Sequence, residues 1–441
     1  MLDPNQQNGF TRREFMKRAA AAGLAVSGAG AFLAACGGGA QTTVGGNSPA
    51  ASGASGANQF GSGGIAGAPY PLARPDAPVT WTIPSDNQPI DSNMPPEKGA
   101  TLKIYNWPYY LAPSLMKSFE QKYDCKVDLT TFPDLEPGVA KISSGQTDFD
   151  LMFGLQIYDV GKLIASKLVQ PINQDYIPNF KANVWDSMQS PFYDVGSRFT
   201  IPYSVWNTGI MWRNDMFKTD IQGLPNPWDI FWNGAPKNKT HMLGNPRDPM
   251  AMAMYWRGQT DPNSSDPTVI DQAKNDILDV VMATNAKFDH NDYNDIPKGG
   301  AWLHQSWSGN VGSAFYFLPK GDTAPYVSYY WPGDSGVPAS VDNDTVVVLN
   351  TAKSPVLAHL FIDWVLDAEN ALTNYTTYTG YQMPQKNVTP ESLVGSGVVP
   401  DHLATTVVTE EQFTKGLRVC ELAPDVDTLY QNAYQQVQAG V

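Results

Sequence analysis

The chain has 441 residues, of which 29 are basic and 43 are acidic, for a formal net charge of −14 at pH 7. This acidic balance argues against nucleic acid as a partner and is compatible with a cationic ligand. The chain is also longer than one hydrophobic core usually serves, so we expect two folded lobes.

The first residues have the pattern of an export signal. The sequence TRREFMK at 11–17 is a twin-arginine motif, and the weakly apolar stretch 19–35 that follows is short for a membrane-spanning helix. LAAC at 33–36 then matches a lipobox, in which the Cys36 thiol takes the lipid. We therefore predict a signal peptide at 1–35 and a lipoprotein exported by the twin-arginine route to the periplasm or cell surface, where Cys36 anchors it to a membrane.

Two segments separate this signal from the folded part. Residues 36–68 are rich in Gly, Ala, Ser and Asn and carry almost no charge, which predicts a flexible tether. Residues 69–100 keep the prolines but add Trp81, Ile83 and Ile90, so we expect an extended strap that lies against the domain.

Alternating strand and helix patterns follow. Residues 102–105 and 126–132 alternate like strands, Ser114 is a candidate helix cap between them, and 150–153 is an apolar run before another helical stretch. The order predicts an α/β lobe with a largely parallel sheet.

The same order of elements returns near the end of the chain. The buried-strand run 345–349 precedes Ser354 and Pro355, a cap and first-turn proline ahead of an apolar helical stripe. The segment 425–438 reads as a helix with Leu429 among its inward residues.

Three aromatic rings crowd the end of the first strand. Trp107, Tyr109 and Tyr110 flank Pro108, which ends the strand and forces a loop. Ligands of open α/β sheets lie beyond the carboxyl ends of the strands. We therefore expect these rings to stay partly exposed until a ligand and the opposite lobe cover them.

The sequence offers little that resembles an enzyme or a metal site. We predict no catalytic residues, cofactor or metal: the five histidines are scattered, and His304 and Ser306 are poor candidates for a base and a nucleophile. The acidic run 289–295 lacks the glycine and terminal glutamate of an EF-hand, so a solvated turn is expected. Cys125 and Cys420 remain as a possible disulfide or as two buried thiols.

Aromatic residues interleave with a few acids near apparent element ends. Ring faces attract a desolvated cation, by roughly 2 kcal/mol, and carboxylates hold its charged ends. The set comprises Trp107, Tyr110, Tyr158, Tyr203, Trp206, Trp307, Trp331 and Tyr381 with Asp248, Asp344 and Glu421.

From Thr101 to Val441 the sequence resembles the spermidine/putrescine-binding proteins of bacterial ABC importers. The order and spacing of several motifs carry this resemblance. They are IYNWPYY at 104–110, DFDLMFG at 148–154, IPYSVWNTGIMWRN at 201–214, QSWSGN at 305–310, VDNDTVVVL at 341–349 and YTGYQMPQKN at 378–387.

The resemblance implies a two-lobed periplasmic-binding-protein fold with a ligand in the cleft between the lobes. Lobe 1 would comprise 101–207 plus 343–385, and lobe 2 would comprise 208–342 plus 386–441. Chain crossings after Ile201-Pro202-Tyr203 and near Asp342 would form the hinge, and binding would select the closed form.

The resemblance also implies the ligand-binding residues. Trp107, Tyr110, Tyr158, Trp307 and Tyr381 would supply rings around the ligand. Asp248 and Asp344 would hold protonated amines, and Glu421 or Cys420 lies near a glutamine position of the family.

Several positions depart from the family pattern. Pro108 and Tyr109 replace a small hydroxyl and an acidic residue, Asp342 stands where tryptophan is common, and Asn245 replaces an aspartate. An aromatic lining remains, but the acids are rearranged.

Three hypotheses follow. The first is a monomeric lipoprotein that captures a polyamine such as spermidine or putrescine and delivers it to an ABC permease. The second keeps the fold and binds another small solute, such as a quaternary amine, an amino-acid derivative or a sugar. The third is a surface hydrolase or a structural lipoprotein.

Overall fold

The computed structural model describes residues 59–132, 134–145, 147–318 and 322–440. All of these belong to one unit, Gly53–Val441. The predicted signal peptide, the lipidation site Cys36 and most of the predicted tether lie outside the described residues.

Strands and helices alternate along most of the described chain. Strands β1 to β12 span Gly61–Gly63, Val79–Trp81, Thr101–Asn106, Lys126–Thr131, Leu151–Gln156, Val169–Gln170, Ile201–Arg213, Thr240–Leu243, Lys287–Asp289, Leu303–Trp307, Val327–Tyr330 and Val341–Leu349. Helices α2 to α14 span Pro113–Tyr123, Leu135–Ser143, Ile157–Ala165, Pro178–Asn183, Asp248–Trp256, Pro267–Thr284, Asp292–Lys298, Ser308–Ala314, Pro355–Leu366, Ala368–Asn374, Pro390–Gly395, Glu410–Lys415 and Pro424–Ala439.

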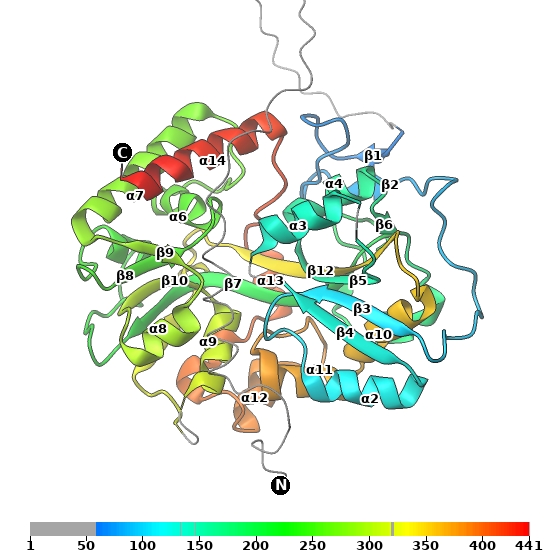
Figure 1. Ribbon diagram of the computed structural model, residues 1–441. Helices are drawn as coiled ribbons and strands as arrows, with labels where there is room; N and C mark the ends of the chain where they lie inside the picture. The colour runs from blue at the N-terminus through cyan, green and yellow to red at the C-terminus, as the bar shows by residue number, and fades with distance from the viewer. Residues whose placement is uncertain (1–58, 133, 146, 319–321, 441) are drawn as a thin grey trace, which may run out of the picture. The chain divides into compact units, whose positions relative to one another are not determined.

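One sheet path connects both halves of the described chain. Its order is β4-β3-β5-β12-β7-β10-β8-β9, with β6 beside β12 (Figure 1). Strand β11 pairs with β7 outside this path. The outer strands β4, β3 and β5 are parallel, and so are β10, β8 and β9. The central strands β12 and β7 run antiparallel to their neighbours. The α/β prediction with largely parallel sheets is therefore confirmed.

Strand β7 changes partners along its length. Residues 201–207 pair with β12, whereas 208–213 pair with β10 or β11. We propose that this change of partner, between Asn207 and Thr208, marks the first crossing between the two lobes that the sequence suggested.

Helices cover both faces of each half of the sheet. In the first half, α2 and α10 bury Phe119 and Phe361 against Ile104, while α3 and α4 bury their apolar residues against the face that carries Tyr105. The alternation of Ile104 and Tyr105 between faces is the period of two expected of a strand. In the second half, α6, α7 and α14 pack together, and α8 and α9 pack against β7 and β10.

The segment before the first long strand is ordered against the domain, as the strap prediction required. Trp81 is 1% exposed, and its indole N–H donates to the Tyr193 carbonyl at 2.8 Å. The tether prediction is wrong for its last residues, because β1 (Gly61–Gly63) pairs antiparallel with β2 and Ile65 bridges Leu72. The side chains of β1 bury little apolar surface, so its order comes from backbone pairing with β2.

Two local predictions need correction. Helix α2 begins at Pro113, so Ala112 rather than Ser114 is the residue before its first turn. In α14 the buried positions include Tyr430 and Tyr434, whereas Leu429 is 37% exposed and does not point inward.

The two cysteines within the described residues are separate thiols. Cys125 and Cys420 are both buried and free, which decides between the two alternatives left open by the sequence. Along the described part of the chain, none of the helices is both long and apolar enough to cross a membrane.

Helix α10 is capped by a residue far away in the sequence. The Glu97 carboxylate accepts the backbone N–H groups of Val356 at 3.0 Å and Leu357 at 2.9 Å. These N–H groups belong to the first turn, where a helix has no internal acceptors and where its dipole favours a negative charge.

We expect Glu97→Ala to lower the free energy of unfolding by about 1–3 kcal/mol, because it leaves two N–H donors of a buried helix end without acceptors. Glu97→Gln keeps one acceptor and should cost about half as much. Urea unfolding measures both. Equal stability of the wild type and Glu97→Ala would contradict the capping role.

Candidate functional site

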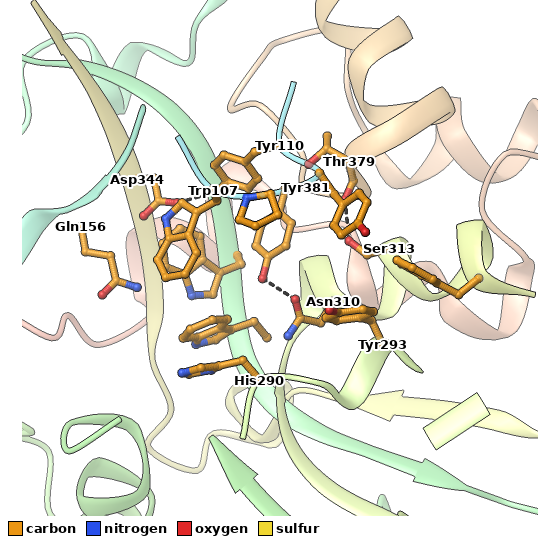
Figure 2. Close-up of a pocket in the computed structure, with 15 residues that line it drawn as sticks. Trp107, Tyr110, Gln156, His290, Tyr293, Asn310, Ser313, Asp344, Thr379 and Tyr381 are labelled. Carbon is orange, nitrogen blue, oxygen red and sulfur yellow. Dashed lines mark hydrogen bonds between the residues drawn. The ribbon is translucent and has the colours of Figure 1, made fainter. Parts of the chain in front are cut away.

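A pocket of about 160 Å³ opens beyond the carboxyl ends of several strands (Figure 2). Its walls come from the loop after β3, the end of β5, the middle of β7 and of β12, the end of β10, and the segment around Tyr381. Most of the lining is aromatic. The residues are Trp107, Pro108, Tyr109, Tyr110, Gln156, Trp206, His290, Tyr293, Trp307, Asn310, Ser313, Phe317, Asp344, Thr379 and Tyr381.

The aromatic loop after β3 differs in part from the expectation. Tyr109 is 42% exposed and Trp107 is partly buried, but Tyr110 is only 5% exposed. Tyr110 is covered by protein rings, since it lies edge-on to Tyr203 and Tyr381, each with centroids 5.2 Å away. Only Trp107 and Tyr109 therefore keep surface that a ligand or another part of the protein could cover.

Trp107 depends on a glycine in the neighbouring strand. Its indole N–H donates to the Gly154 carbonyl at 3.0 Å. Gly154 has a φ of +74°, and a Cβ there would lie 2.1 Å from the Trp107 ring. The glycine thus supplies both a left-handed backbone and the space that the indole fills.

Asp344 is the acid within this aromatic pocket. The Tyr110 hydroxyl donates to Asp344 Oδ2 at 2.5 Å, and Ser204 Oγ lies 2.5 Å from the same tyrosine oxygen. Register shifts in β12 follow Asp344 in both pairings, between Asp344 and Thr345 against β7 and between Thr345 and Val346 against β5. Such bulges are frequent beside functional sites because they turn a side chain out of the regular pleat.

Two buried acceptor atoms, on paired residues of neighbouring strands, have no hydrogen bonds among the described residues. Asp344 is 4% exposed and pairs in register with Gln156, which is 8% exposed. Among the described residues, neither Asp344 Oδ1 nor Gln156 Oε1 has a hydrogen-bond donor. Burial raises the pKa of Asp344 to about 7, against the lowering effect of the Tyr110 and Ser204 hydrogen bonds. A cationic donor in the pocket would satisfy both oxygens.

The opposite wall is built from stacked rings. Trp206 lies 6.0 Å from Trp307, and His290 stacks on Trp307 at 5.0 Å with an interplanar angle of 13°. The Tyr381 hydroxyl donates to Asn310 Oδ1 at 2.7 Å, as Figure 2 shows. These contacts fix the rings from both sides before any ligand enters.

A second hollow of about 10 Å³ shares Gln156, Trp206 and Trp307 with the pocket. It is lined by the predicted residues Tyr158 and Asp248 and by Asp342. This volume holds about one water molecule. Burial raises the pKa of Asp248 above its usual range and that of Asp342 to about 7.

Asp248 already has partners in this hollow. The Asn245 side-chain amide donates to Asp248 Oδ2 at 2.7 Å, and Thr208 Oγ1 lies 3.4 Å from Oδ1. The asparagine that replaces an aspartate at position 245 thus supplies a hydrogen bond to Asp248.

Glu421 lies apart from the pocket. It accepts a hydrogen bond from the Tyr70 hydroxyl at 2.7 Å and lines two other cavities, beside Gly161 and along α14. Its position does not support the prediction that it belongs to the same site. Trp331 also lies elsewhere: it is 3% exposed and donates to the Ser340 carbonyl.

Sequence reasoning missed seven lining residues, namely Gln156, His290, Tyr293, Asn310, Ser313, Phe317 and Thr379. Asn310 and Thr379 lie inside the motifs at 305–310 and 378–387, and Gln156 ends β5, so the available signal was their position in a motif or at a strand end. His290 and Tyr293 belong to the acidic run expected to be a solvated turn, and that expectation is wrong. The run ends β9 and begins α8, and Asp292 is fully buried.

We expect Gly154→Ala to lower the free energy of unfolding by about 2–4 kcal/mol, through left-handed strain and displacement of the Trp107 ring. Gly258→Ala is the matched control, since Gly258 has a φ of +77° and nothing within 4 Å of its Cβ position. It should cost only about 1 kcal/mol. Urea unfolding of both variants measures the difference, and equal losses would contradict the packing role of Gly154.

Relatives of known function match most of the chain at low identity. "Spermidine/putrescine-binding periplasmic protein 1" of Haemophilus influenzae is 24% identical over 343 residues, which cover 77% of this chain and 89% of that protein. The "Putrescine/cadaverine-binding protein" of Pseudomonas aeruginosa is 26% identical over 283 residues, covering 62% of this chain and 77% of the relative.

Solved structures share the fold. A putative spermidine/putrescine ABC transporter protein from Listeria monocytogenes superposes with a TM-score of 0.64 at 21% identity, covering 77% of this chain and 98% of that one. The substrate-binding protein PotD of Streptococcus pneumoniae gives a TM-score of 0.63 at 21% identity, with 78% and 99% covered. These likenesses confirm the predicted periplasmic-binding-protein fold.

The family model for bacterial extracellular solute-binding proteins matches residues 107–372, well over half of the chain. This span contains the loop with Trp107, the buried Asp344 and most of the pocket between them. The chain therefore belongs to the bacterial extracellular solute-binding protein family.

Proposed function

We propose that the chain is the extracytoplasmic solute-binding component of an ABC importer and that it captures a polyamine-class cation in the pocket around Asp344. The observation that carries this proposal is the buried Asp344 Oδ1, which has no donor among the described residues. The names of the spermidine- and putrescine-binding relatives support the same ligand class.

A primary ammonium fits the polar end of the pocket. It brings a positive charge and three N–H donors, and the unpartnered oxygens of Asp344 and Gln156 lie at the same end of the pocket. The pairing of a buried carboxylate with a cation offsets the desolvation of both groups. The Tyr110 hydroxyl fixes the other carboxylate oxygen and so orients the free one.

The aromatic walls fit the rest of a polyamine. Methylene groups between the ammonium ends pack against Trp107, Trp307 and Tyr381, and each ring face also attracts nearby positive charge. Every CH₂ group removed from water contributes about 0.8 kcal/mol. A linear amine requires both kinds of group, an acid to pair with its charged end and rings to cover its methylene groups.

A function in binding rather than catalysis is part of the proposal. Ser306, the candidate nucleophile, is fully buried and donates to the Asp292 carboxylate. Its hydroxyl therefore faces an acceptor on the protein and no open pocket. We also propose delivery to an ABC permease, a monomeric state, and lipid anchoring through Cys36 after twin-arginine export.

A second candidate ligand carries a single cationic end. Asp344 is the one carboxylate that lines the main pocket among the described residues, since Asp248 and Asp342 lie in the hollow with room for one water. A second ammonium would therefore meet rings and amides in place of an acid. This observation favours a quaternary or primary monoamine as the alternative.

We expect Asp344→Asn to weaken the binding of spermidine and putrescine by roughly 10²–10³-fold, because it leaves a buried ammonium without its charge partner. Asp342→Asn is the matched control and should change the affinity less than about threefold. Calorimetric titration of the full chain, purified without a tag and freed of bound solute by partial unfolding and dialysis, measures both.

The same titration separates the candidate ligands. Spermidine or putrescine binding with micromolar or tighter affinity supports the polyamine proposal. Binding of choline with neither polyamine bound would favour the monoamine candidate. Equal affinity of the wild type and Asp344→Asn for every cation would remove Asp344 from the site.

The raised pKa of Asp344 gives the binding a defined pH dependence. In the free folded protein the carboxyl titrates near pH 7, so its neutral form is favoured below that pH. A cationic ligand favours the ionised form and must displace this proton when the pH is low. The ligand's own amines, with pKa values of about 10, stay charged throughout.

We therefore expect the dissociation constant for spermidine to rise about 25-fold between pH 7.5 and 5.5, with little change above pH 7.5. Titrations in buffers of different ionisation enthalpy should reveal proton release at pH 6. Asp342→Asn should keep this dependence, since it leaves Asp344 in place. A dissociation constant that does not change across this pH range would contradict the assignment of Asp344 as the titrating group.

A further inference from the structure

Three metal-ligating side chains that are far apart in the sequence meet beside the pocket. His241, Asp289 and His304 offer ligand atoms that all lie within 4.8 Å of one another. They come from three adjacent parallel strands, β8, β9 and β10. His304 faces His241 directly across the strand pair, and Asp289 ends the neighbouring strand.

The histidines are buried and the acid opens to solvent. His304 and His241 are 0% and 3% exposed, whereas 29% of the Asp289 side chain is exposed. Water and a small ion can therefore reach the cluster past Asp289, while the imidazoles stay fixed in the sheet.

The contacts of His304 leave one ring nitrogen as a ligand. Its Nδ1 contacts the Gln305 backbone carbonyl, to which only an N–H can donate. The other nitrogen, Nε2, lies 3.4 Å from Asp289 Oδ1. In neutral imidazole this nitrogen carries a lone pair that faces a carboxylate, so a cation belongs between them. A carbonyl on the distant nitrogen is also the usual arrangement of histidines that bind metals.

A proton on His304 would satisfy its own contact with Asp289, but it would leave a nitrogen of His241 without a partner. His241 Nδ1 lies 2.9 Å from Asp289 Oδ2, whereas its Nε2 has no hydrogen-bond partner among the described residues. A buried ring nitrogen without a partner is costly. One ion bound by Asp289 and both histidines would give all three side chains a partner at once.

The surroundings are negative enough to hold a divalent ion. Asp292 is fully buried nearby, where it accepts hydrogen bonds from Ser306 and from the Asn310 amide at 2.6 Å. A cation among the histidines would offset the charges of Asp289 and Asp292 together.

We propose that His241, Asp289 and His304 form a binding site for a zinc-like divalent transition metal ion, with solvent at the remaining position. Two imidazoles and one carboxylate are a ligand set that suits Zn²⁺. Tetrahedral zinc holds its ligand atoms about 3.3 Å apart. The observed 2.9 and 3.4 Å contacts of Asp289 match that spacing, and the third pair closes by small side-chain rotations.

The site would link the sheet to the wall of the ligand pocket. His290 follows Asp289 and stacks on Trp307, and β10 carries both His304 and Trp307. The metal proposal does not depend on which solute the pocket binds, because its residues are not those that contact Asp344.

The test is a calorimetric titration of the untagged full chain with Zn²⁺ after treatment with a chelator. We expect one ion per chain with a micromolar or tighter dissociation constant, and a rise in melting temperature on saturation. Co²⁺ should bind in the same stoichiometry and give the visible absorption of a low-coordinate nitrogen and oxygen site.

Two variants identify the ligands. Asp289→Asn should weaken Zn²⁺ binding at least about 100-fold, more than the loss of an outer-shell partner usually causes. His241→Leu should weaken Zn²⁺ binding to the same extent; it also removes the 2.9 Å contact between the imidazole and Asp289, so the metal-free variant is compared with the wild type in urea unfolding before titration. His402→Gln alters an exposed histidine and should bind as the wild type does.

A wild-type chain that binds no Zn²⁺ in a saturable way would overturn the proposal. Retained affinity in both Asp289→Asn and His241→Leu would overturn it as well, and so would an equal loss in His402→Gln. Far-ultraviolet circular dichroism of each variant establishes that any loss of binding occurs in a folded chain.

Discussion

The site depends on one constraint, the burial of the Asp344 carboxylate among aromatic rings in the middle of the sheet. Among the described residues, one of its oxygens, Oδ1, is buried without a donor, whereas Oδ2 accepts hydrogen bonds from Tyr110 and Ser204. A charge so placed is costly unless a cation joins it. The bulges in β12, the Tyr110–Ser204 contacts and the neighbouring Gln156 all serve to hold this one carboxylate open toward the pocket. The proposed preference for cations rests on the same cost, because an anion would leave the buried oxygen unpaired and a neutral donor would leave its charge unbalanced.

The rings around this acid are held by close approaches that only glycine permits. A Cβ at Gly154 would overlap Trp107, and one at Gly309 would lie 2.4 Å from the Tyr381 ring. Protein rings bury Tyr110, whereas Trp107 and Tyr109 keep surface available. The crowding of rings after β3 therefore has two causes: one ring supports the acid from within, and the others remain for a ligand.

The periodic parts of the fold were predictable from the sequence, because strands and helices with one buried face repeat their apolar residues at fixed spacing. That spacing located β3, β4, the helix with Phe119 and the valine strand that carries Asp344. Contacts between residues far apart in the sequence left no such trace. Glu97 caps a helix that begins at Pro355. The Asn245 side chain donates a hydrogen bond to the Asp248 carboxylate, which the residue types did not predict either. Glu421 was predicted as a ligand-binding residue from its place near a family position. Its hydrogen-bond partner is instead Tyr70, from the segment before the first long strand.

The acidic run 289–295 shows why residue type alone misled the prediction. Asp, His and Asn in sequence are typical of a solvated turn, but the run joins β9 to α8 at the carboxyl edge of a parallel sheet. Strands that are distant in sequence end side by side at this edge. His241 and His304 are separated by 62 residues along the chain. They face each other only because β8 and β10 pair in register. Strand pairing thus brings the two imidazoles together beside Asp289, and β10 connects them to the pocket because it carries His304 near its start and Trp307 at its end.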